Sequence, residues 1–453
     1  MKRSTVTALG AGVLGGYIGV RAYKRTRGSL GLRTESGVRI VILGAGFAGL
    51  SAASGIAHSL GPGAQIFLVD QRNYHLFTPM LYQVAACAVL PYDAAIPLRS
   101  LTTARTIEFV KATVTGINFP AQQVTTDAGP IAYDYLIVAL RSATNFFGNR
   151  SAEEHAIQVK SLEDGIAVRN RVIDTLEEAS RVTGPDRRRT LLTFAIVGGG
   201  ATGVETAGAM AQVVKHVVPK NYPAINPRDC RVVLIESGPK LLGHMSGKMA
   251  EIALHSLRRA GVEVWLNARA KDFSDGEVVT EDGRSVKTST VLWTTGIRAP
   301  DVISKLDVVH GPAGSIAVNN YLQLAAYPNV FAIGDNASIH NRSPVPLLAA
   351  SAMQEGSAAA TNVARLLRGK PLVPFRYRNL GNVISLGHGS GVAEIGGRVI
   401  AGFAGWLVWR VVHIARLTNL RNKVATALDW STAWFYDVDT ARFETDERSR
   451  TGA

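Results

Sequence analysis

Two glycine-rich fingerprints of the same form are the residues best suited to chemistry in this chain of 453 residues. The first spans residues 44–49 (Gly-Ala-Gly-Phe-Ala-Gly) and the second spans 198–203 (Gly-Gly-Gly-Ala-Thr-Gly). Glycines at this spacing permit a tight turn and let the backbone approach a pyrophosphate, which rests on the N-terminus of the following helix. One such motif is weak evidence, but two in the same context are much stronger. The residues expected to contact two dinucleotides are Gly44, Gly46, Phe47, Ala48, Gly49, Gly198, Gly200, Thr202 and Gly203.

The segments around each fingerprint predict the strand–turn–helix context that the motif requires. Apolar runs at 38–43 and 191–197 precede the two loops and are typical of buried parallel strands. Segments rich in small residues, 50–60 and 204–214, follow the loops and predict helices. The sequence therefore indicates an α/β chain with two Rossmann-like domains.

An acidic residue follows the second strand of each unit. Asp70 comes after the apolar strand 66–69, and Glu236 comes after 231–235, beyond an insertion at 215–228. A carboxylate at this place accepts hydrogen bonds from a ribose 2′-hydroxyl and repels a 2′-phosphate, so Glu236 favours NADH over NADPH. The alternative is that each acid is merely solvated at the end of a strand.

A third element predicts which fingerprint serves a flavin. The late strand 330–333 ends in Gly334 and Asp335, and in two-dinucleotide flavoproteins such an aspartate reaches the ribityl chain of FAD. The FAD domain is then split around an inserted NAD domain. We expect an N-terminal extension at 1–37 and the first half of the FAD domain at 38–155. The NADH domain follows at 156–315, the second half of the FAD domain at 316–380, and a C-terminal membrane-interface segment at 381–453.

The run at 70–85, Asp-Gln-Arg-Asn-Tyr-His-Leu-Phe-Thr-Pro-Met-Leu-Tyr-Gln-Val-Ala, makes a family resemblance specific. With the stretches 161–164, 202–205, 291–296 and 332–337, it resembles type II NADH:quinone oxidoreductases from Val38 to the C-terminus. The resemblance implies a single-chain, monotopic membrane enzyme. It would pass a hydride from NADH to FAD and then two electrons to a quinone, ubiquinone or menaquinone, without pumping protons.

The same resemblance implies roles for individual side chains. Gln71, Arg72 and Gly296 join the cofactor-binding set, and Glu205 is expected beside the nicotinamide as a catalytic residue. Gln354 is expected on a helix that opens over the pyrimidine edge of the flavin. For Glu205 the alternative is an acid in the first helical turn that the helix dipole stabilises. For Gln354 the alternative is an ordinary polar helix residue.

Three positions depart from the family pattern. Leu140-Arg141 replaces a Thr-Gly pair, which implies a shifted loop or an added contact to phosphate. Ala350 and Leu380 stand where the family has a glutamine and a lysine near the quinone. Two alternatives therefore stay open: an NADH-dependent flavoprotein with a non-quinone acceptor, and a slow-turnover protein that responds to NADH.

Composition excludes other classes. The chain is 47% hydrophobic with 45 glycines, which favours βαβ units over disorder. The net charge of +14 is dispersed and lies in no nucleic-acid motif, so cofactor phosphates and anionic lipid explain it better. The only cysteines, Cys87 and Cys230, are too far apart in sequence for a redox pair, and no residues have metal-ligand spacing.

The C-terminal segment predicts a membrane contact. Aromatic and apolar residues between 400 and 420 alternate with Arg410, His413 and Arg416, which interrupt any spanning helix. We expect an interfacial helix with its tryptophans at headgroup depth and its basic residues toward lipid phosphates, followed by a second amphipathic piece at 424–436. The alternative is a homodimer interface. The polar tail, 439–453, is expected to be disordered.

The N-terminus is a glycine-rich apolar run, 5–20, between basic residues. It is short for a transmembrane helix and lacks a signal-peptide cleavage pattern. We expect a membrane-associating extension on a protein at the cytoplasmic face of the cell inner membrane. Residues 1–34 contain no acid, so a transit peptide to the mitochondrial inner membrane is the alternative.

Overall fold

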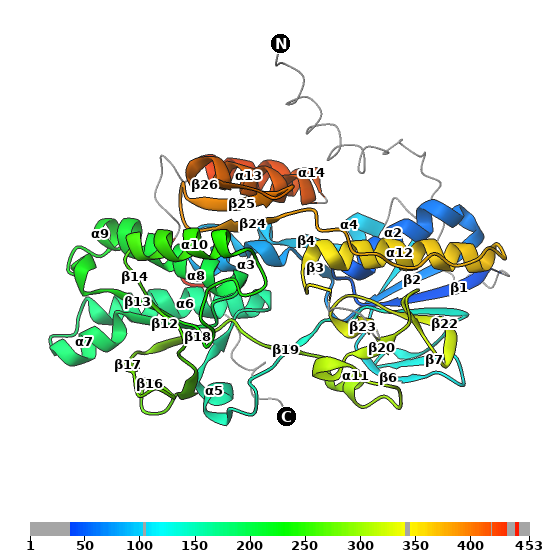
Figure 1. Ribbon diagram of the computed structural model, residues 1–453, viewed down its shortest axis with the longest axis horizontal. Helices are drawn as coiled ribbons and strands as arrows, with labels where there is room; N and C mark the ends of the chain where they lie inside the picture. The colour runs from blue at the N-terminus through cyan, green and yellow to red at the C-terminus, as the bar shows by residue number, and fades with distance from the viewer. Residues whose placement is uncertain (1–36, 103–105, 340–344, 418, 433–439, 444–453) are drawn as a thin grey trace, which may run out of the picture. The chain divides into compact units, whose positions relative to one another are not determined.

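In the computed structural model, the first fingerprint follows β1, an inner strand of a six-stranded sheet (Figure 1). The strand order is β21-β22-β9-β1-β2-β5. β1 is parallel to β2 on one side and to β9 on the other, and β22 adds to β9 in parallel. The strands in that order are Gln323–Leu324, Tyr327–Ala332, Tyr135–Val138, Val38–Leu43, Ala64–Asp70 and Ile107–Lys111. Because the two halves of this sheet come from opposite sides of the second fingerprint, the first domain is split as predicted.

The structure describes residues 37–102, 106–339, 345–417, 419–432 and 440–443. All the elements below belong to the unit that begins at Val38. The expected N-terminal extension lies outside the described residues, apart from Gly37. Cys87 is buried and Cys230 is partly buried.

Two helices from opposite ends of the split domain pack closely over its sheet. α2 (Phe47–Leu60) follows the first fingerprint, and α12 (Ala349–Leu367) comes from the second half of the domain (Figure 1). A Cβ at Gly356 would lie 2.3 Å from the carbonyl oxygen of Ala48, and one at Gly55 would lie 2.7 Å from Ala360 Cβ. Glycines at the crossing therefore let the two backbones approach each other.

The second fingerprint leaves a five-stranded parallel sheet of order β11-β18-β12-β13-β14. These strands are Ile157–Gln158, Thr290–Trp293, Thr193–Val197, Arg231–Ile235 and Val262–Trp265. The strand predicted from Leu191 begins two residues later, because Leu191 ends helix α7 (Pro185–Leu191). The helices that accompany this sheet are α6 (Leu162–Ala179), α8 (Ala201–Gln212) and α10 (Gly247–Arg259).

The chain passes between the cores of the two domains at other residues than the predicted boundaries, 155/156 and 315/316. Ala152 packs with Ala195 and Val233 of the second sheet, ahead of residue 156. Ala299 and Ile303 already pack with the first sheet, ahead of residue 316. The two crossing segments pair with each other as the antiparallel strands β10 (Ala143–Thr144) and β19 (Ile297–Arg298).

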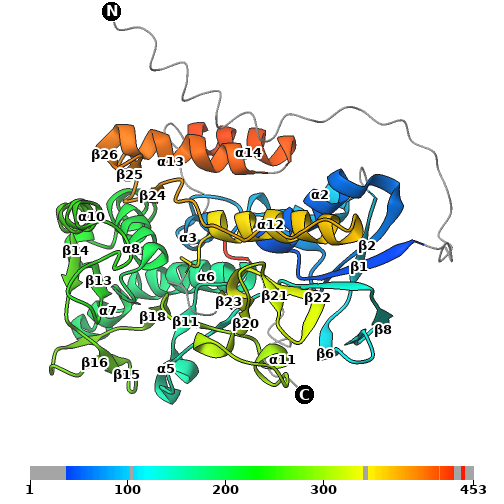
Figure 2. The ribbon, with the colours of Figure 1, turned by 45° about the vertical axis from the view of Figure 1, so that its right-hand side comes forward.

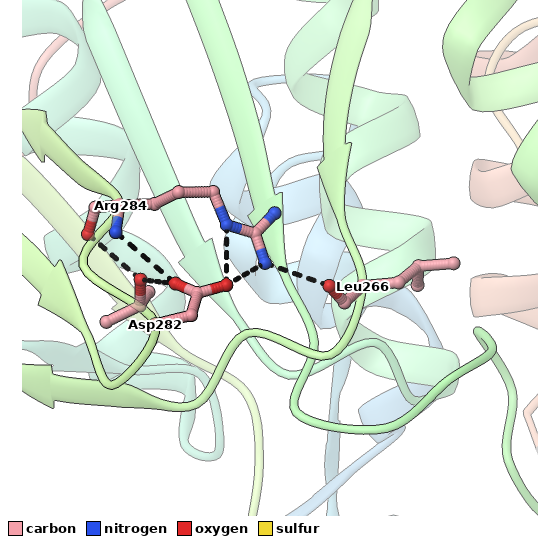
Figure 3. Close-up of polar contacts among 4 residues, drawn as sticks. Leu266, Asp282 and Arg284 are labelled. Carbon is pink, nitrogen blue, oxygen red and sulfur yellow. Dashed lines mark hydrogen bonds and ion pairs between the residues drawn. The ribbon is translucent and has the colours of Figure 1, made fainter.

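A small antiparallel sheet extends the second domain. It contains β15 (Ala270–Asp272), β16 (Glu277–Thr280) and β17 (Ser285–Lys287). In the turn between the last two strands, Arg284 donates from Nε and Nη2 to Asp282 Oδ2, at 2.8 and 2.5 Å (Figure 3). Nη2 also donates to the carbonyl oxygen of Leu266, so the guanidinium ties the hairpin to the loop after β14. Hydrogen bonds from Arg284 and Thr280 hold the pKa of Asp282 well below its ordinary value.

The C-terminal segment is a three-stranded sheet followed by two helices. β24 (Asn382–Ser385), β25 (Gly391–Ile395) and β26 (Arg398–Ala401) are antiparallel neighbours. α13 (Gly402–Arg416) packs on β25, and α14 (Leu420–Thr432) contacts α13 (Figure 2). β24 contacts α8 and β25 contacts α10, so the segment covers helices of the second domain.

The prediction that the tryptophans of this segment face lipid is wrong for those that the structure describes. Trp406, Trp409 and Trp430 are only 5%, 1% and 4% exposed. His413 is also buried and stacks on Trp409, while Arg410 lies over the rings of Trp406 and Trp430. These three tryptophans, His413 and Arg410 therefore lie on the side of the helices that packs against the protein, whereas Phe403 is exposed. Trp434 lies outside the described residues.

The expectation of a disordered tail is wrong for residues 440–443. Asn170 on α6 donates to the carbonyl oxygen of Phe443 and accepts from its amide, at 2.6 and 3.0 Å. The buried Arg169 donates to the carbonyl oxygen of Ala441, and Arg442 pairs with Asp174 at 2.9 Å. This segment therefore fastens to α6 through backbone and side-chain bonds.

Candidate functional site

The first fingerprint makes a turn in which two glycines are required for packing and one faces open space. Gly44 has φ +98°, and a Cβ there would lie 2.2 Å from the carbonyl oxygen of Ala139. A Cβ at Gly49 would lie 1.8 Å from the carbonyl oxygen of Gly44. Gly46, the N-cap of α2, has no atom within 4 Å of its would-be Cβ. The turn thus leaves room at the helix N-terminus, where a phosphate is favoured.

A cavity of about 630 Å³ opens in front of this turn. Seven residues predicted to bind the cofactor line it: Gly46, Phe47, Ala48, Gln71, Arg72, Gly334 and Asp335. Gly44, Gly49 and Asp70 lie behind them and support the turn. The structure therefore brings together residues from both halves of the split domain.

The second fingerprint repeats this geometry. Gly198 has φ +110°, and a Cβ at Gly203 would lie 1.8 Å from the carbonyl oxygen of Gly198. Gly200 is the N-cap of α8 and, like Gly46, faces open space. Thr202 is exposed in the first turn of the helix. Two separate stretches of sequence thus form the same open turn at a helix N-terminus, where an anion is favoured.

The two strand-end acids brace the fingerprints. Asp70 accepts the amide of Ala45 at 2.7 Å, and Glu236 accepts the amide of Gly199 at 2.5 Å. Each carboxylate also accepts a second backbone amide just beyond its own strand, from Arg72 and from Gly238. A carboxylate has about four lone-pair sites, so the predicted ribose contacts remain compatible with this bracing role.

The late Gly-Asp pair is held in place by two partners. Gly334 has φ +65°, and its amide donates to the buried carboxylate of Glu355 at 2.5 Å. Asp335 accepts from the hydroxyl of Ser142 at 2.5 Å. Burial raises the pKa of Glu355 to about 7. Ser142 follows β9, so both halves of the domain orient Asp335.

Two cations in the same cavity were not assigned as site residues from the sequence. Arg141 lines the cavity, and its Nε and Nη2 atoms are shielded from solvent and have no hydrogen-bond partner among the residues that the structure describes. Lys160 also lines it and donates from Nζ to the carbonyl oxygen of Ala143 at 3.0 Å. Burial lowers the pKa of Lys160 to about 8, with Asp335 opposing the shift. The departure of Arg141 from the family pattern is a sequence signal that could have identified it as a site residue. No pattern in the sequence indicates Lys160.

These features fit FAD. The open helix terminus at Gly46 accepts a pyrophosphate, and the unpartnered guanidinium of Arg141 supplies donors that an anion would satisfy. Such a buried donor otherwise carries a desolvation cost of roughly 1–3 kcal/mol. The loop carrying Arg141 is the one whose Ala139 carbonyl contacts Gly44, so Arg141 lies beside the first fingerprint. The added phosphate contact expected there agrees with this position.

Glu205 lies deep in the protein rather than at a helix terminus. It is the fifth residue of α8, so the alternative of a first-turn acid held by the helix dipole is wrong. Its Oε1 accepts from the amide of Ser385 at 3.1 Å and from the indole Nε1 of Trp409 at 3.0 Å. Burial raises its pKa to about 8, so the carboxyl group is protonated near neutral pH.

Two further predicted residues have structural contacts of their own. Gln354 exchanges hydrogen bonds with the backbone of Arg378, both at 3.0 Å, and does not line the cofactor cavity. Its helix begins five residues earlier, at Ala349, which does line it. Gly296 has φ +76°, and a Cβ there would lie 2.4 Å from the carbonyl oxygen of Asn145. A glycine is thus required at position 296, next to the place where the two segments that connect the domains pair as β10 and β19.

Replacing Arg141 should weaken FAD binding. We expect Arg141→Gln to lower affinity by roughly ten- to a hundredfold, because a charge-assisted hydrogen bond contributes ~1.5–3 kcal/mol. The measurement is release of FAD from the purified holoprotein, followed by flavin fluorescence on dilution. Arg298→Gln is the matched control, since Arg298 lines the same cavity but already pairs with Asp301 at 2.6 Å. Equal FAD release from both variants would contradict the role of Arg141.

Glu205 should make stability depend on pH. Its folded-state pKa is raised, so its contribution is fully present below about 4.5 and is lost as pH rises through about 8. In Glu205→Gln the side chain keeps its shape and stays neutral at every pH. The melting temperature of this variant, relative to that of the wild type, should therefore rise from pH 6 to pH 9. Thermal unfolding followed by circular dichroism checks this. Glu263→Gln is the control, because Arg231 lowers the pKa of Glu263 and no trend is expected in this range. A constant difference for Glu205→Gln would refute the assignment.

Comparison with known proteins agrees with this geometry. Residues 38–356 match the family described as pyridine nucleotide-disulphide oxidoreductase. The type II NADH:quinone oxidoreductase Ndh of Mycobacterium tuberculosis is 33% identical over 409 residues, covering 87% of each chain. That of Staphylococcus saprophyticus is 27% identical, covering 80% of this chain and 91% of its own.

Solved structures show the same fold. The structure of NDH2 from Plasmodium falciparum in complex with NADH has a TM-score of 0.80 at 18% identity, covering 89% of this chain and 99% of its own. The sulfide:quinone oxidoreductase of Aquifex aeolicus has a TM-score of 0.67 at 19% identity, covering 88% and 91%. The expected fold class is confirmed. With its paired nucleotide loops and its identity to the mycobacterial enzyme over most of both chains, this chain belongs to the type II NADH:quinone oxidoreductases.

Proposed function

We propose that this protein transfers a hydride from NADH to FAD and then passes two electrons to a membrane quinone, without pumping protons. The observation that carries the proposal is the pair of matching glycine turns. One opens into the cavity that Asp335 and Arg141 line, and the other begins the helix that carries Glu205. Membership of the family supports the same order of electron transfer.

The chain's own residues bind and orient the cofactors in this proposal. The two turns would hold one pyrophosphate each, and Asp335 would bind the ribityl chain; the hydrogen bond from Ser142 to Asp335 supports this role by orienting the carboxylate. FAD, when bound, supplies the hydride-accepting and electron-transferring chemistry. Positive charge at Lys160 favours an anionic reduced cofactor in the same cavity. Glu205 is proposed to contribute a neutral carboxyl group near the nicotinamide.

The acceptor is the least constrained part of the function. Ala350 lies in the first turn of α12, and Leu380 is 61% exposed, so neither offers the polar group that the family pattern implies. Anaerobic reduction of the flavin by NADH, then reoxidation by ubiquinone or menaquinone analogues in separate experiments, tests the proposal. Rapid reoxidation by a quinone supports it. Reduction without reoxidation by either would favour another acceptor or a slow NADH-responsive protein.

An exposed apolar surface supports membrane binding. Phe403, Leu407 and Val411 recur every four residues on α13, and Leu420, Val424 and Leu428 do so on α14. We call these six side chains the apolar stripes; each is about half or more exposed. Fully burying one such side chain contributes about 1.5–3 kcal/mol. The stripes therefore suit an interfacial helix pair at the cytoplasmic face of the bacterial inner membrane or, alternatively, at the mitochondrial inner membrane.

A homodimer is the second occupant that these stripes would fit, since large exposed apolar patches mark protein or membrane contacts. Among the described helices, none is both long and apolar enough to cross a bilayer. The N-terminal run that we also expect to associate with membrane lies outside the described residues.

Glu236 should set the choice of nucleotide. We expect NADH to reduce the flavin on the order of tenfold or more efficiently than NADPH, because the carboxylate at the end of β13 repels a 2′-phosphate. Glu236→Gln should narrow this ratio. The measurement is kcat/KM for both nucleotides, with Glu251→Gln on the exposed face of α10 as the control. Equal wild-type efficiencies would refute this prediction.

The apolar stripes should be needed for membrane binding. The double variant Leu407→Gln and Val411→Gln should float poorly with liposomes that contain anionic lipid, whereas flavin reduction by NADH should persist. Val309→Gln with Val373→Gln is the matched control, since both valines are exposed outside the stripes. If the stripe variant floats like the wild type but no longer dimerises, the stripes form a subunit interface instead.

A further inference from the structure

A buried histidine lies behind the first fingerprint. His75 belongs to the run at 70–85 and is only 2% exposed. It is the middle residue of β3 (Tyr74–Leu76), and it pairs with Ile96 of the antiparallel strand β4 (Ala95–Pro97). The imidazole therefore extends from regular, hydrogen-bonded backbone rather than from a loop.

The imidazole of His75 is bonded to the backbone of the fingerprint. Its Nδ1 lies 2.9 Å from the carbonyl oxygen of Ala45. A carbonyl oxygen can only accept a hydrogen bond, so Nδ1 carries the proton and donates it. Burial lowers the pKa of His75 to about 4, so the ring is neutral near neutral pH. A neutral imidazole has one N–H, and this bond uses it.

The peptide unit that follows Ala45 is thereby fixed at two points. The amide of Ala45 donates to Asp70 Oδ2 at 2.7 Å, and the carbonyl of Ala45 accepts from His75. No peptide bond among the described residues is cis. In a planar trans peptide the C=O and the following N–H point in opposite directions. Holding the Ala45 carbonyl toward His75 therefore turns the N–H of Gly46 away from His75.

The same imidazole contacts the residue after Gly46. Phe47 begins α2 and lines the cofactor cavity. Its ring meets the imidazole of His75 edge to face, with centroids 4.9 Å apart and an angle of 89° between the planes. His75 thus touches the residues on both sides of Gly46, one through a hydrogen bond and the other through ring packing.

The second fingerprint has the same arrangement with a different donor. Gly199 occupies the position that Ala45 has in the first fingerprint, and its amide donates to Glu236. The carbonyl oxygen of Gly199 accepts from the backbone amide of Leu242 at 2.8 Å. Leu242 comes after β13 as His75 comes after β2, so each domain holds the same carbonyl from the segment that follows its second strand. In the first domain the donor is a side chain, which a substitution can remove.

We propose that His75 is a positioning residue for FAD. Its Nδ1–H holds the Ala45 carbonyl so that the N–H of Gly46 is turned into the cofactor cavity, toward the pyrophosphate. Gly46 lines that cavity and His75 does not, which agrees with this orientation. His75 therefore acts through the backbone of the turn. The inference rests on the proposed function only in that FAD occupies this cavity.

Two substitutions separate the hydrogen bond from the ring packing. In His75→Asn the amide nitrogen is bonded to Cγ, as Nδ1 is in histidine, so the donor is kept and the ring is lost. In His75→Phe the ring is kept and the donor is lost. We expect His75→Phe to release FAD roughly tenfold faster than the wild type, because a buried carbonyl loses its partner. His75→Asn should stay within about twofold of the wild-type rate, because this bond is retained.

The measurement is the release of FAD from the oxidised holoprotein after dilution, followed by flavin fluorescence. The phosphorus NMR spectrum of the bound pyrophosphate is a second readout, and it should shift in His75→Phe but not in His75→Asn. His413→Phe is the matched control. His413 is also buried, and its Nδ1 also bonds a backbone carbonyl, that of Trp409, at 2.7 Å. This control should release FAD like the wild type.

The two variants give opposite results if only packing matters. Faster release from His75→Asn than from His75→Phe would overturn the inference, and so would wild-type release from His75→Phe. If His75→Phe does not fold, His75→Asn still discriminates: slow release with an unchanged phosphorus spectrum supports the inference, and rapid release overturns it. These measurements use neither NADH nor a quinone. Failure of the flavin to be reduced or reoxidised would therefore count against the proposed function alone.

Discussion

The close contact between a glycine turn and the helix it begins is the constraint on which the rest of the structure depends. In both domains the carbonyl oxygen of the first fingerprint glycine occupies the place where a Cβ of the last one would be, and an acid at the end of the neighbouring strand holds the turn through a backbone amide. With Gly44 and Gly49 fixed in this way, Gly46 faces open space at a helix N-terminus. The turn leaves no room for a side chain at Gly44 or Gly49, but it keeps the helix N-terminus open to a phosphate.

This constraint explains why much of the fold could be predicted from the sequence. Glycine spacing, apolar runs and strand-end acids are local patterns, and β1 and β13 begin and end at the predicted residues. The strand before Asp335 could also be predicted from its apolar residues and the Gly-Asp pair that follows. It pairs with β9 of the first sheet, although the whole second domain lies between the two strands in the sequence. The domain crossings were less predictable, since Ala299 and Ile303 are apolar residues of common types that would fit either core.

The C-terminal segment shows where local reasoning fails. Tryptophan and arginine are typical of a membrane interface, yet Trp406, Trp409 and Arg410 pack inward on each other. The residues that face outward are Phe403, Leu407 and Val411. They recur every four residues, so this helical spacing could have been used to predict the exposed face of α13. The partners of Glu205 were beyond reach for another reason. Trp409 is 204 residues away along the chain, and no local pattern predicts such a contact.

The contacts of the C-terminal segment place several tasks on one element. Its outer face carries the apolar stripes, while its inner face gives Trp409 to Glu205 and Trp430 to Gln83. Residues 440–443 then fasten to α6 through Arg169 and Asn170. α13 presents Leu407 to its outer face and buries Trp409 on its inner face, so a single helix joins the apolar stripes to the indole that bonds Glu205. Any shift of α13 on binding a membrane would therefore change the hydrogen bonding of a buried acid whose pKa lies near 8, and with it the charge beside the proposed nicotinamide site.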